Sequence, residues 1–210
     1  MGSLIPLKKE VERCLRVELE RIDFRRSKGS FLKTINDQTD GWLGLTPAIL
    51  QQYGVVDIFP VVGVLNKPIW NLAQQWWGYE PPKGWIWPTA SEPLYKLANA
   101  PESYSWQFDR IEKIPTLVKD LADRISHYGI SWINRLSSAE SLLEYILSHG
   151  AHGVEFTKYA IPAAYIVLNR REEARQYVQR ALREIEEHEG IWSGYTVGWE
   201  KRYREIMSNI

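Results

Sequence analysis

Imidazole and carboxylate side chains at a regular spacing are the first feature of this sequence that could do chemistry. His149, His152 and Glu155 follow an H-x-x-H-x-x-E pattern, and imidazole nitrogens and carboxylate oxygens both bind zinc. Gly150 and Gly153 interrupt the pattern. This stretch is therefore predicted to be a loop at the end of a helix rather than a helix that directs both imidazoles to one side. We predict no metal site here.

Four residues have the right types for acid–base catalysis: Asp57, His127, His149 and Glu155. Such groups must converge in a cleft to act together. The sequence contains no phosphate-binding glycine loop, no G-x-S-x-G turn and no Cys–His pairing of known spacing. We therefore expect no catalytic residue and no cofactor. A hydrolase or small-ligand enzyme, with its site between the sheet and the helices, is the alternative function.

Aromatic residues are unusually dense between residues 70 and 87. The chain has 10 Trp and 11 Tyr, and five of the Trp lie in this segment. Large aromatic side chains are enriched at binding hot spots because they bury much area at a low entropic cost. The predicted binding residues are Trp76, Trp77, Tyr79, Trp85 and Trp87, with the last two as anchors beside several prolines. A core role stays open as the alternative, and it is favoured for Trp70 and for one of the pair Trp76 and Trp77.

The overall charge balance excludes some classes of partner. The chain of 210 residues has 26 basic and 26 acidic side chains, whereas nucleic-acid-binding proteins usually carry a basic footprint. Only the stretch from Lys8 to Lys33 leans basic, and it is interpreted as a solvated helix face followed by a charged strand. We expect no nucleic-acid partner.

Cysteine content and hydropathy indicate the compartment. Cys14 is the only cysteine, so no internal disulfide can form, and this fits a reducing environment. The chain has no apolar run of the ~20 residues that a membrane helix needs, and charged residues at positions 8–10 interrupt any leader-like segment. We expect a cytoplasmic protein with no membrane contact.

Periodicity in the first half predicts a helix followed by strands. Apolar residues at helical spacing predict an amphipathic helix over 4–23. Three strands are predicted around 30–35, 42–45 and 55–65, with short connections that favour an antiparallel meander. Pro60 places the third strand at an edge or a bulge. A helix from Pro68 to Trp77 follows, and further short strands are predicted around 85–87 and 104–108.

The second half is predicted to be helical. A helix from Ile114 is expected to end at Gly129, and Ser137 with Glu140 forms a capping-box pattern before a helix that Gly150 closes. Helices over 159–168, with Pro162 in the first turn, and over 171–188 should form a hairpin, and a last short helix follows. The prediction is a single α+β domain over 1–210. Its antiparallel sheet of three to five strands and N-terminal helix lie in 1–110, and a C-terminal helical bundle from 111–210 packs on the sheet.

A set of short segments runs in a characteristic order along most of the chain. They are residues 22–26 (IDFRR), 30–32 (SFL), 55–64 (VVDIFPVVGV), 127–132 (HYGISW) and 136–138 (LSS), followed by a helix that leads through Leu168 and Asn169 into Ala174. This order resembles a class of uncharacterised bacterial domains, some of which look like the immunity partners of secreted toxins. The class supplies no catalytic residues to carry over. The resemblance implies an intracellular bacterial protein that binds a partner rather than catalyses a reaction.

The sequence thus favours a non-catalytic protein-binding protein. Its specific form would be an immunity-type inhibitor that neutralises a bacterial toxin domain, and the expected partner is that domain. The motivation is the aromatic segment, the neutral charge, the lack of a catalytic motif and the resemblance.

Overall fold

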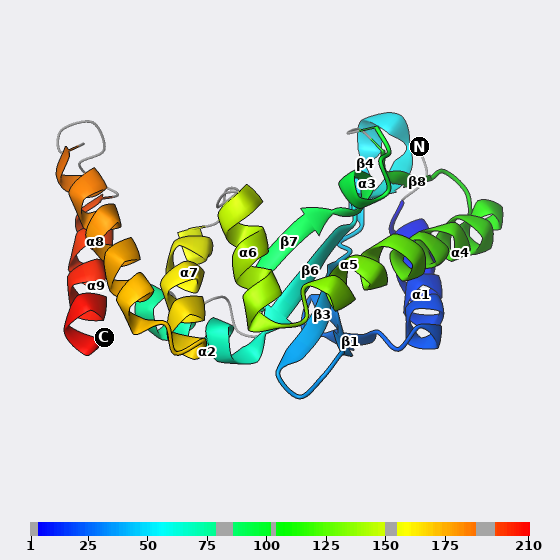
Figure 1. Cartoon of the computed structure of the whole chain (residues 1–210). Coiled ribbons are helices and arrows are strands. Elements are labelled where there is room, and N and C mark those ends of the chain that lie inside the picture. Colours follow the sequence, from blue (N-terminus) through cyan, green and yellow to red (C-terminus); the bar gives the residue numbers. More distant parts are fainter. Residues whose placement is uncertain (1–3, 79–85, 102–103, 150–154, 188–195) are drawn as a thin grey trace. The chain divides into compact units, whose positions relative to one another are not determined.

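The structure of the protein is a computed structural model that describes residues 4–78, 86–101, 104–149, 155–187 and 196–210 (Figure 1). The first elements are α1 (Ile5–Arg21), β1 (Arg25–Ser27), β2 (Ser30–Thr34), β3 (Thr39–Gly44), β4 (Ala48–Leu50), β5 (Val55–Ile58), β6 (Val61–Asn66) and α2 (Lys67–Trp77). They are followed by β7 (Ala90–Pro93), α3 (Leu94–Leu97), β8 (Trp106–Phe108), α4 (Ile114–Arg124), α5 (Ile130–Arg135), α6 (Ala139–His149), α7 (Glu155–Val167), α8 (Arg171–Glu187) and α9 (Thr196–Asn209). The predicted α+β class, with an N-terminal helix, an antiparallel sheet and C-terminal helices, is confirmed.

The chain divides into two compact units. Unit 1 comprises residues 1–65 and 81–137, and unit 2 comprises residues 66–80 and 138–210. Unit 1 holds all the described strands except the last residue of β6, and unit 2 consists of helices α2 and α6 to α9. The description of the chain as one domain stays a prediction.

The main sheet of unit 1 has five strands in the described residues, in the order β1-β2-β3-β6-β7 (Figure 1). The pairs β1–β2, β2–β3 and β6–β7 are antiparallel. A second sheet has the order β4-β5-β8 and is also antiparallel. The prediction of one strand over 55–65 is wrong. The strand is interrupted at Phe59 and Pro60, and the two strands on either side, β5 and β6, join different sheets. Pro60 cannot donate to a strand ladder, so the ladder ends there.

Helices α1 and α4 pack against each other in unit 1. Helix α1 buries the stripe Leu7, Val11, Leu15 and Leu19, which recurs every four residues as an amphipathic helix requires. The expected end at Gly129 is wrong, because α4 continues through a π-helical turn, Ile125–Gly129, into α5. Gly129 is buried in mid-helix, and a Cβ there would lie 3.3 Å from Val62 of β6. The glycine therefore allows the helix to approach the sheet closely rather than ending it.

Helix α7 is the core of unit 2 and packs against α2, α6 and α8. Its residues 159–164 are all buried, which is typical of a helix surrounded by others. Pro162 lies inside this helix rather than in its first turn as predicted, because α7 begins earlier, at Glu155. Asn169, with φ of 58°, makes the tight connection of the predicted α7–α8 hairpin.

The start of α6 also differs from the prediction in one residue. The Oγ atom of Ser138, not of Ser137, accepts a hydrogen bond from a first-turn backbone N–H, that of Ser141, at 3.1 Å. The Oγ atom of Ser137 instead donates to the carbonyl oxygen of Asn134 at 2.8 Å. Two adjacent serines offered the same capping chemistry, and Ser138 is the one used because α6 begins at the next residue, Ala139.

Candidate functional site

Three of the clustered tryptophans lie on α2. The helix begins where the Asn66 side chain accepts a hydrogen bond from a first-turn backbone N–H at 3.2 Å, and it ends at Gly78, whose φ is 59°. Trp70 and Trp77 are two turns apart, so they share one helix face. Trp76 is offset from Trp77 by about 100° around the helix axis. Trp76 therefore extends from the helix in a different direction from Trp70 and Trp77.

Trp70 and Trp77 both pack against Phe156 of α7. The ring centroids of Trp70 and Phe156 are 6.4 Å apart, and those of Trp77 and Phe156 are 5.5 Å apart in an edge-to-face arrangement at 62°. Phe156 is only 1% exposed. Trp77, one of the predicted binding residues, thus packs against the core of unit 2, and both Trp76 and Trp77 are half-buried.

Trp76 lines a hollow of about 350 Å³ on unit 2, which we call the Trp76 hollow. It is formed by Leu72, Gln75 and Trp76 of α2, Ile166 of α7, Arg171 of α8, and Asn209 with Ile210 at the end of α9. The aliphatic side chains and the indole give the hollow an apolar lining, and the guanidinium and the amides are its polar groups. The sequence offered no signal that joins these residues, because they come from four different helices.

Two arginines donate hydrogen bonds to the backbone of the helices that form the Trp76 hollow. The Arg202 Nη1 atom donates to the carbonyl oxygen of Trp76 at 3.0 Å, at the end of α2. Arg202 also occupies the space that a side chain at position 78 would need. The Arg171 Nη1 atom donates to the carbonyl oxygen of Ile210 at 3.4 Å. Three helices are therefore tied together around the hollow.

Trp87, the last tryptophan of the aromatic segment, belongs to unit 1. Trp87 is half-buried, and it follows Ile86, whose carbonyl oxygen accepts a hydrogen bond from Trp42 Nε1 at 2.9 Å. Residues 86–88 form no strand, contrary to the strand expected over 85–87. Tyr79 and Trp85, two further predicted binding residues, lie outside the described residues. The five predicted residues thus do not all belong to one unit.

The acid–base candidates of unit 1 have separate surroundings. The Asp57 carboxylate on β5 is half-buried and accepts a hydrogen bond from Ser105 Oγ at 2.6 Å. His127 is exposed on the π-helical turn, where its ring meets that of Tyr128 edge to face with centroids 4.5 Å apart. Within the described residues, no hydrogen bond or ion pair joins Asp57 to His127. Neither residue has the paired geometry that acid–base catalysis needs.

The candidates of unit 2 lie near the end of α6. His149 is exposed and stacks on Tyr145 with ring centroids 4.2 Å apart, and its Nδ1 atom is 3.0 Å from the carbonyl oxygen of that tyrosine. His152 and the side chain of Glu155 lie outside the described residues. In the part of the chain that the structure describes, no group of three or more His, Cys, Asp and Glu side chains could hold a metal ion.

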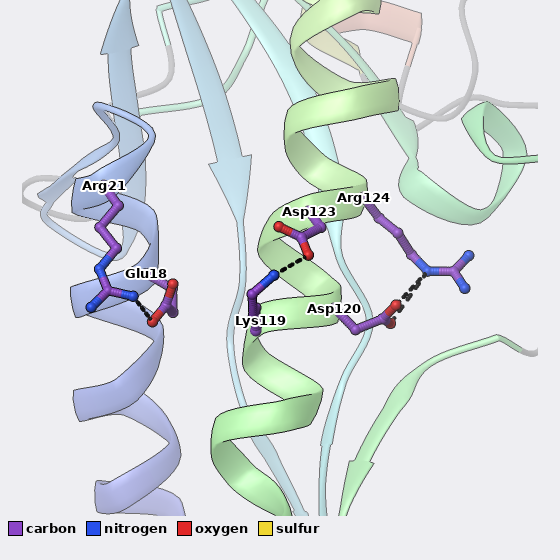
Figure 2. A network of polar contacts seen from close by, with 6 residues as sticks. All are labelled: Glu18, Arg21, Lys119, Asp120, Asp123 and Arg124. Atoms are coloured by element: carbon purple, nitrogen blue, oxygen red, sulfur yellow. Dashed lines mark hydrogen bonds and ion pairs between the residues drawn. The ribbon is translucent and has the colours of Figure 1, made fainter.

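Charged side chains on α1 and α4 form a separate polar surface (Figure 2). Within α4, Lys119 Nζ is 2.7 Å from an Asp123 carboxylate oxygen, and Arg124 Nε is 3.3 Å from Asp120. The hydrogen bond that Lys119 Nζ donates to the Asp123 carboxylate raises the pKa of Lys119 above its ordinary value. These pairs and the one formed by Glu18 and Arg21 on α1 join residues three or four apart on one helix. In these pairs opposite charges neutralise each other along one helix, so this surface is typical of helix solvation rather than of a site.

The comparisons with known proteins leave the family of the chain open. No protein-family model matches it, and no curated protein and no solved structure shows a significant match. Within the described residues, no helix combines the length and the apolar character needed to cross a membrane.

Proposed function

We propose that this protein is a non-catalytic protein-binding protein and that the Trp76 hollow is part of its contact surface. The observation that carries the proposal is the contrast between two neighbours on α2. The Trp77 ring packs on the buried Phe156, whereas Trp76 lines an open hollow together with Arg171. Trp and Arg are the residue types most enriched among hot spots, and such residues act where a partner can exclude water around them.

The geometry of the hollow favours an ordered binding surface. Arg171 of α8 donates to the backbone carbonyl oxygen of Ile210, at the end of α9. Arg202 of α9 donates to the backbone carbonyl oxygen of Trp76, at the end of α2. A surface that is already ordered loses little conformational entropy when a partner docks. The apolar floor and the polar rim also match the usual anatomy of protein interfaces.

The specific form of the proposal is an immunity-type inhibitor in the bacterial cytoplasm that neutralises a toxin domain. It rests on the resemblance of the sequence segments described above. An inhibitor of this kind acts by covering its partner, so its own surface must supply the hot spots. An anchor such as Trp76 is the kind of residue that this mode of action requires.

The test compares capture of a partner by the tagged full chain and by three variants. Trp76→Ala and Arg171→Ala are each expected to lower the recovery of the partner from a lysate of the source bacterium at least about tenfold. Asn71→Ala, which changes an exposed residue of α2 outside the hollow, is the matched control and should leave recovery unchanged. Circular dichroism melting of each variant separates a loss of binding from a loss of folding.

Two results would contradict the proposal. One is equal recovery of the same partner by the wild type, Trp76→Ala and Arg171→Ala. The other is the absence of any partner that binds the wild type and survives washing. The specific form is tested by expressing the toxin domain encoded next to this gene: the wild type should restore growth and Trp76→Ala should restore it less.

A further inference from the structure

A second hollow, of about 170 Å³, lies in unit 1 between α1 and the edge of the main sheet. Leu15 of α1, Phe31 of β2 and Leu45, which follows β3, are buried and form its apolar floor. Glu12, Arg26, Gly29, Thr46 and Pro47 complete the lining. We call it the Arg26 hollow.

Strand register places Arg26 on the core side of the sheet. Arg26 of β1 is directly opposite Phe31 of β2, and Phe31 is directly opposite Leu43 of β3. Residues opposite each other share a sheet face, and Phe31 and Leu43 are both buried. Arg25 is opposite Leu32 and therefore faces the other side of the sheet. Only one of two adjacent arginines can thus contribute to the hollow.

Arg26 is the one cation among the described residues that line the hollow, and other cations flank the lining residues in the sequence. Arg26 is exposed and forms no ion pair with any described residue, and the same holds for Lys28 in the adjacent hairpin turn. Glu12 is the one carboxylate among the lining residues, and Lys8 Nζ balances it from 4.0 Å away on the same helix. Arg16 is one helical turn beyond Glu12, is exposed and likewise has no ion pair among the described residues. An incoming carboxylate at the hollow would therefore meet the unpaired guanidinium of Arg26.

Protection of the sheet edge against pairing with another strand explains only part of this arrangement of charges. Edge strands often carry charged residues that prevent pairing with another sheet edge. That role applies equally to Arg25 and Arg26 on β1, whereas only Arg26 lines a hollow with an apolar floor. The volume is also below the range of ~300–1,000 Å³ that is typical of small-molecule sites.

We propose that the Arg26 hollow binds one apolar side chain of a partner protein that carries carboxylates beside it, with Arg26 pairing to a carboxylate. The floor of Leu15, Phe31 and Leu45 would take the apolar group. The guanidinium is a planar donor suited to bidentate contact with a carboxylate at the rim. The Trp76 hollow belongs to the other unit, so the two sites share no residue. A negative result for one site therefore leaves the proposal for the other site standing.

The probe for this site is the capped peptide acetyl-Glu-Leu-Glu-amide, titrated into the ¹⁵N-labelled full chain to about 5 mM. We expect saturable shifts of the backbone amide signals of Gly29, Phe31 and Thr46. The peptides acetyl-Lys-Leu-Lys-amide and acetyl-Glu-Ala-Glu-amide separate the charge from the apolar contact. Both are expected to bind at least about fivefold more weakly, because each lacks one of the two contacts.

Two adjacent variants form a matched pair for this titration. Arg26→Gln should weaken binding of the acidic peptide about tenfold, since it removes a hydrogen-bonded ion pair. Arg25→Gln has the same net charge and changes the opposite sheet face, so it should keep the wild-type affinity within about twofold. Glu12→Gln should not weaken binding, because Glu12 repels the incoming carboxylate.

Four outcomes would overturn the proposal. The first is no shift at these amides at the highest peptide concentration. The second is equal weakening by Arg25→Gln and Arg26→Gln, which would indicate general attraction by net charge. The third is binding of sodium acetate as tight as that of the peptide, which would indicate a bare anion site. The fourth is weaker binding by Glu12→Gln.

Discussion

The hydroxyl group of Tyr203 on α9 lies 3.5 Å from the backbone carbonyl oxygen of Lys158 on α7. In a regular helix this carbonyl would accept a hydrogen bond from the amide of residue 162. Residue 162 is proline, which has no N–H to donate. A side chain from a distant part of the sequence therefore supplies a donor at the point where the proline removes one. The contact joins α9 to the central helix of unit 2.

Ionisation of buried tyrosines should lower stability at high pH. Burial raises the pKa of Tyr177 to about 12 from an ordinary value of 10.0, and burial also raises the pKa of Tyr203. Above pH 10 the unfolded chain loses these protons first, so the contribution to stability is complete below pH 10 and is lost as the pH rises toward 12. For Tyr177 the loss by about pH 11.5 is about 2 kcal/mol. Urea unfolding of the full chain at about pH 9 and about pH 11.5 measures this loss of unfolding free energy.

The matched variants for this titration are Tyr177→Phe and Tyr53→Phe. Phenylalanine cannot ionise, so Tyr177→Phe should lose less stability between the two pH values than the wild type does. Tyr53 is 69% exposed, and Tyr53→Phe should follow the wild type. Identical pH dependence of the wild type and Tyr177→Phe would show that Tyr177 is not protected from ionisation by burial.

Replacement of Gly63 on β6 should destabilise unit 1. A Cβ atom at this position would lie 2.6 Å from the Cβ atom of Pro88 and 3.0 Å from the ring of Trp42. The chain on both sides of Pro88 is held, because Trp42 Nε1 donates to Ile86 at 2.9 Å and the Thr89 amide donates to the Val64 carbonyl oxygen at 2.7 Å. Gly63→Ala is therefore expected to cost about 1–3 kcal/mol of unfolding free energy, measured by urea unfolding.

The control for this substitution is Gly198→Ala on α9. A Cβ atom there would have no neighbour within 4 Å among the described residues, and alanine is about 0.5–1 kcal/mol more favourable than glycine inside a helix. The two glycine-to-alanine changes should thus have opposite signs. A Gly63→Ala variant as stable as the wild type would mean that the segment 86–89 can move away from the sheet.

Two adjacent serines should differ in their effect on α6. Ser138→Ala removes the oxygen that accepts the Ser141 N–H and is expected to cost about 1 kcal/mol. Ser137→Ala removes only a hydroxyl that donates to Asn134 and should cost a few tenths of a kcal/mol. Amide hydrogen exchange in the first turn of α6 is the local measurement. Faster exchange in Ser137→Ala than in Ser138→Ala would contradict the assignment of the cap.

Local chemistry along the chain was sufficient to predict most elements. The apolar spacing in 4–23, the proline at 68 and the glycine at 78 predicted α1 and α2 to within two residues at their ends, because helix periodicity and capping depend on near neighbours. The α+β class and the antiparallel pairing of β2 with β3 followed from patterns of the same range. Pro60 led to the prediction of an edge or a bulge in one strand, whereas the structure has two strands there, β5 and β6, which join different sheets.

Residue types along the chain indicate which side chains could serve a site, but contacts between distant segments set where each of these side chains lies. Trp76 and Trp77 are adjacent and chemically identical, and no local rule distinguishes them. Their roles separate because Phe156, about eighty positions further along the chain, packs under one face of α2. Arg25 and Arg26 differ in the same way, because strand pairing with β2 directs only Arg26 to the hollow. Burial and strand register are set by contacts between distant segments, and these contacts leave no periodic signal in the sequence.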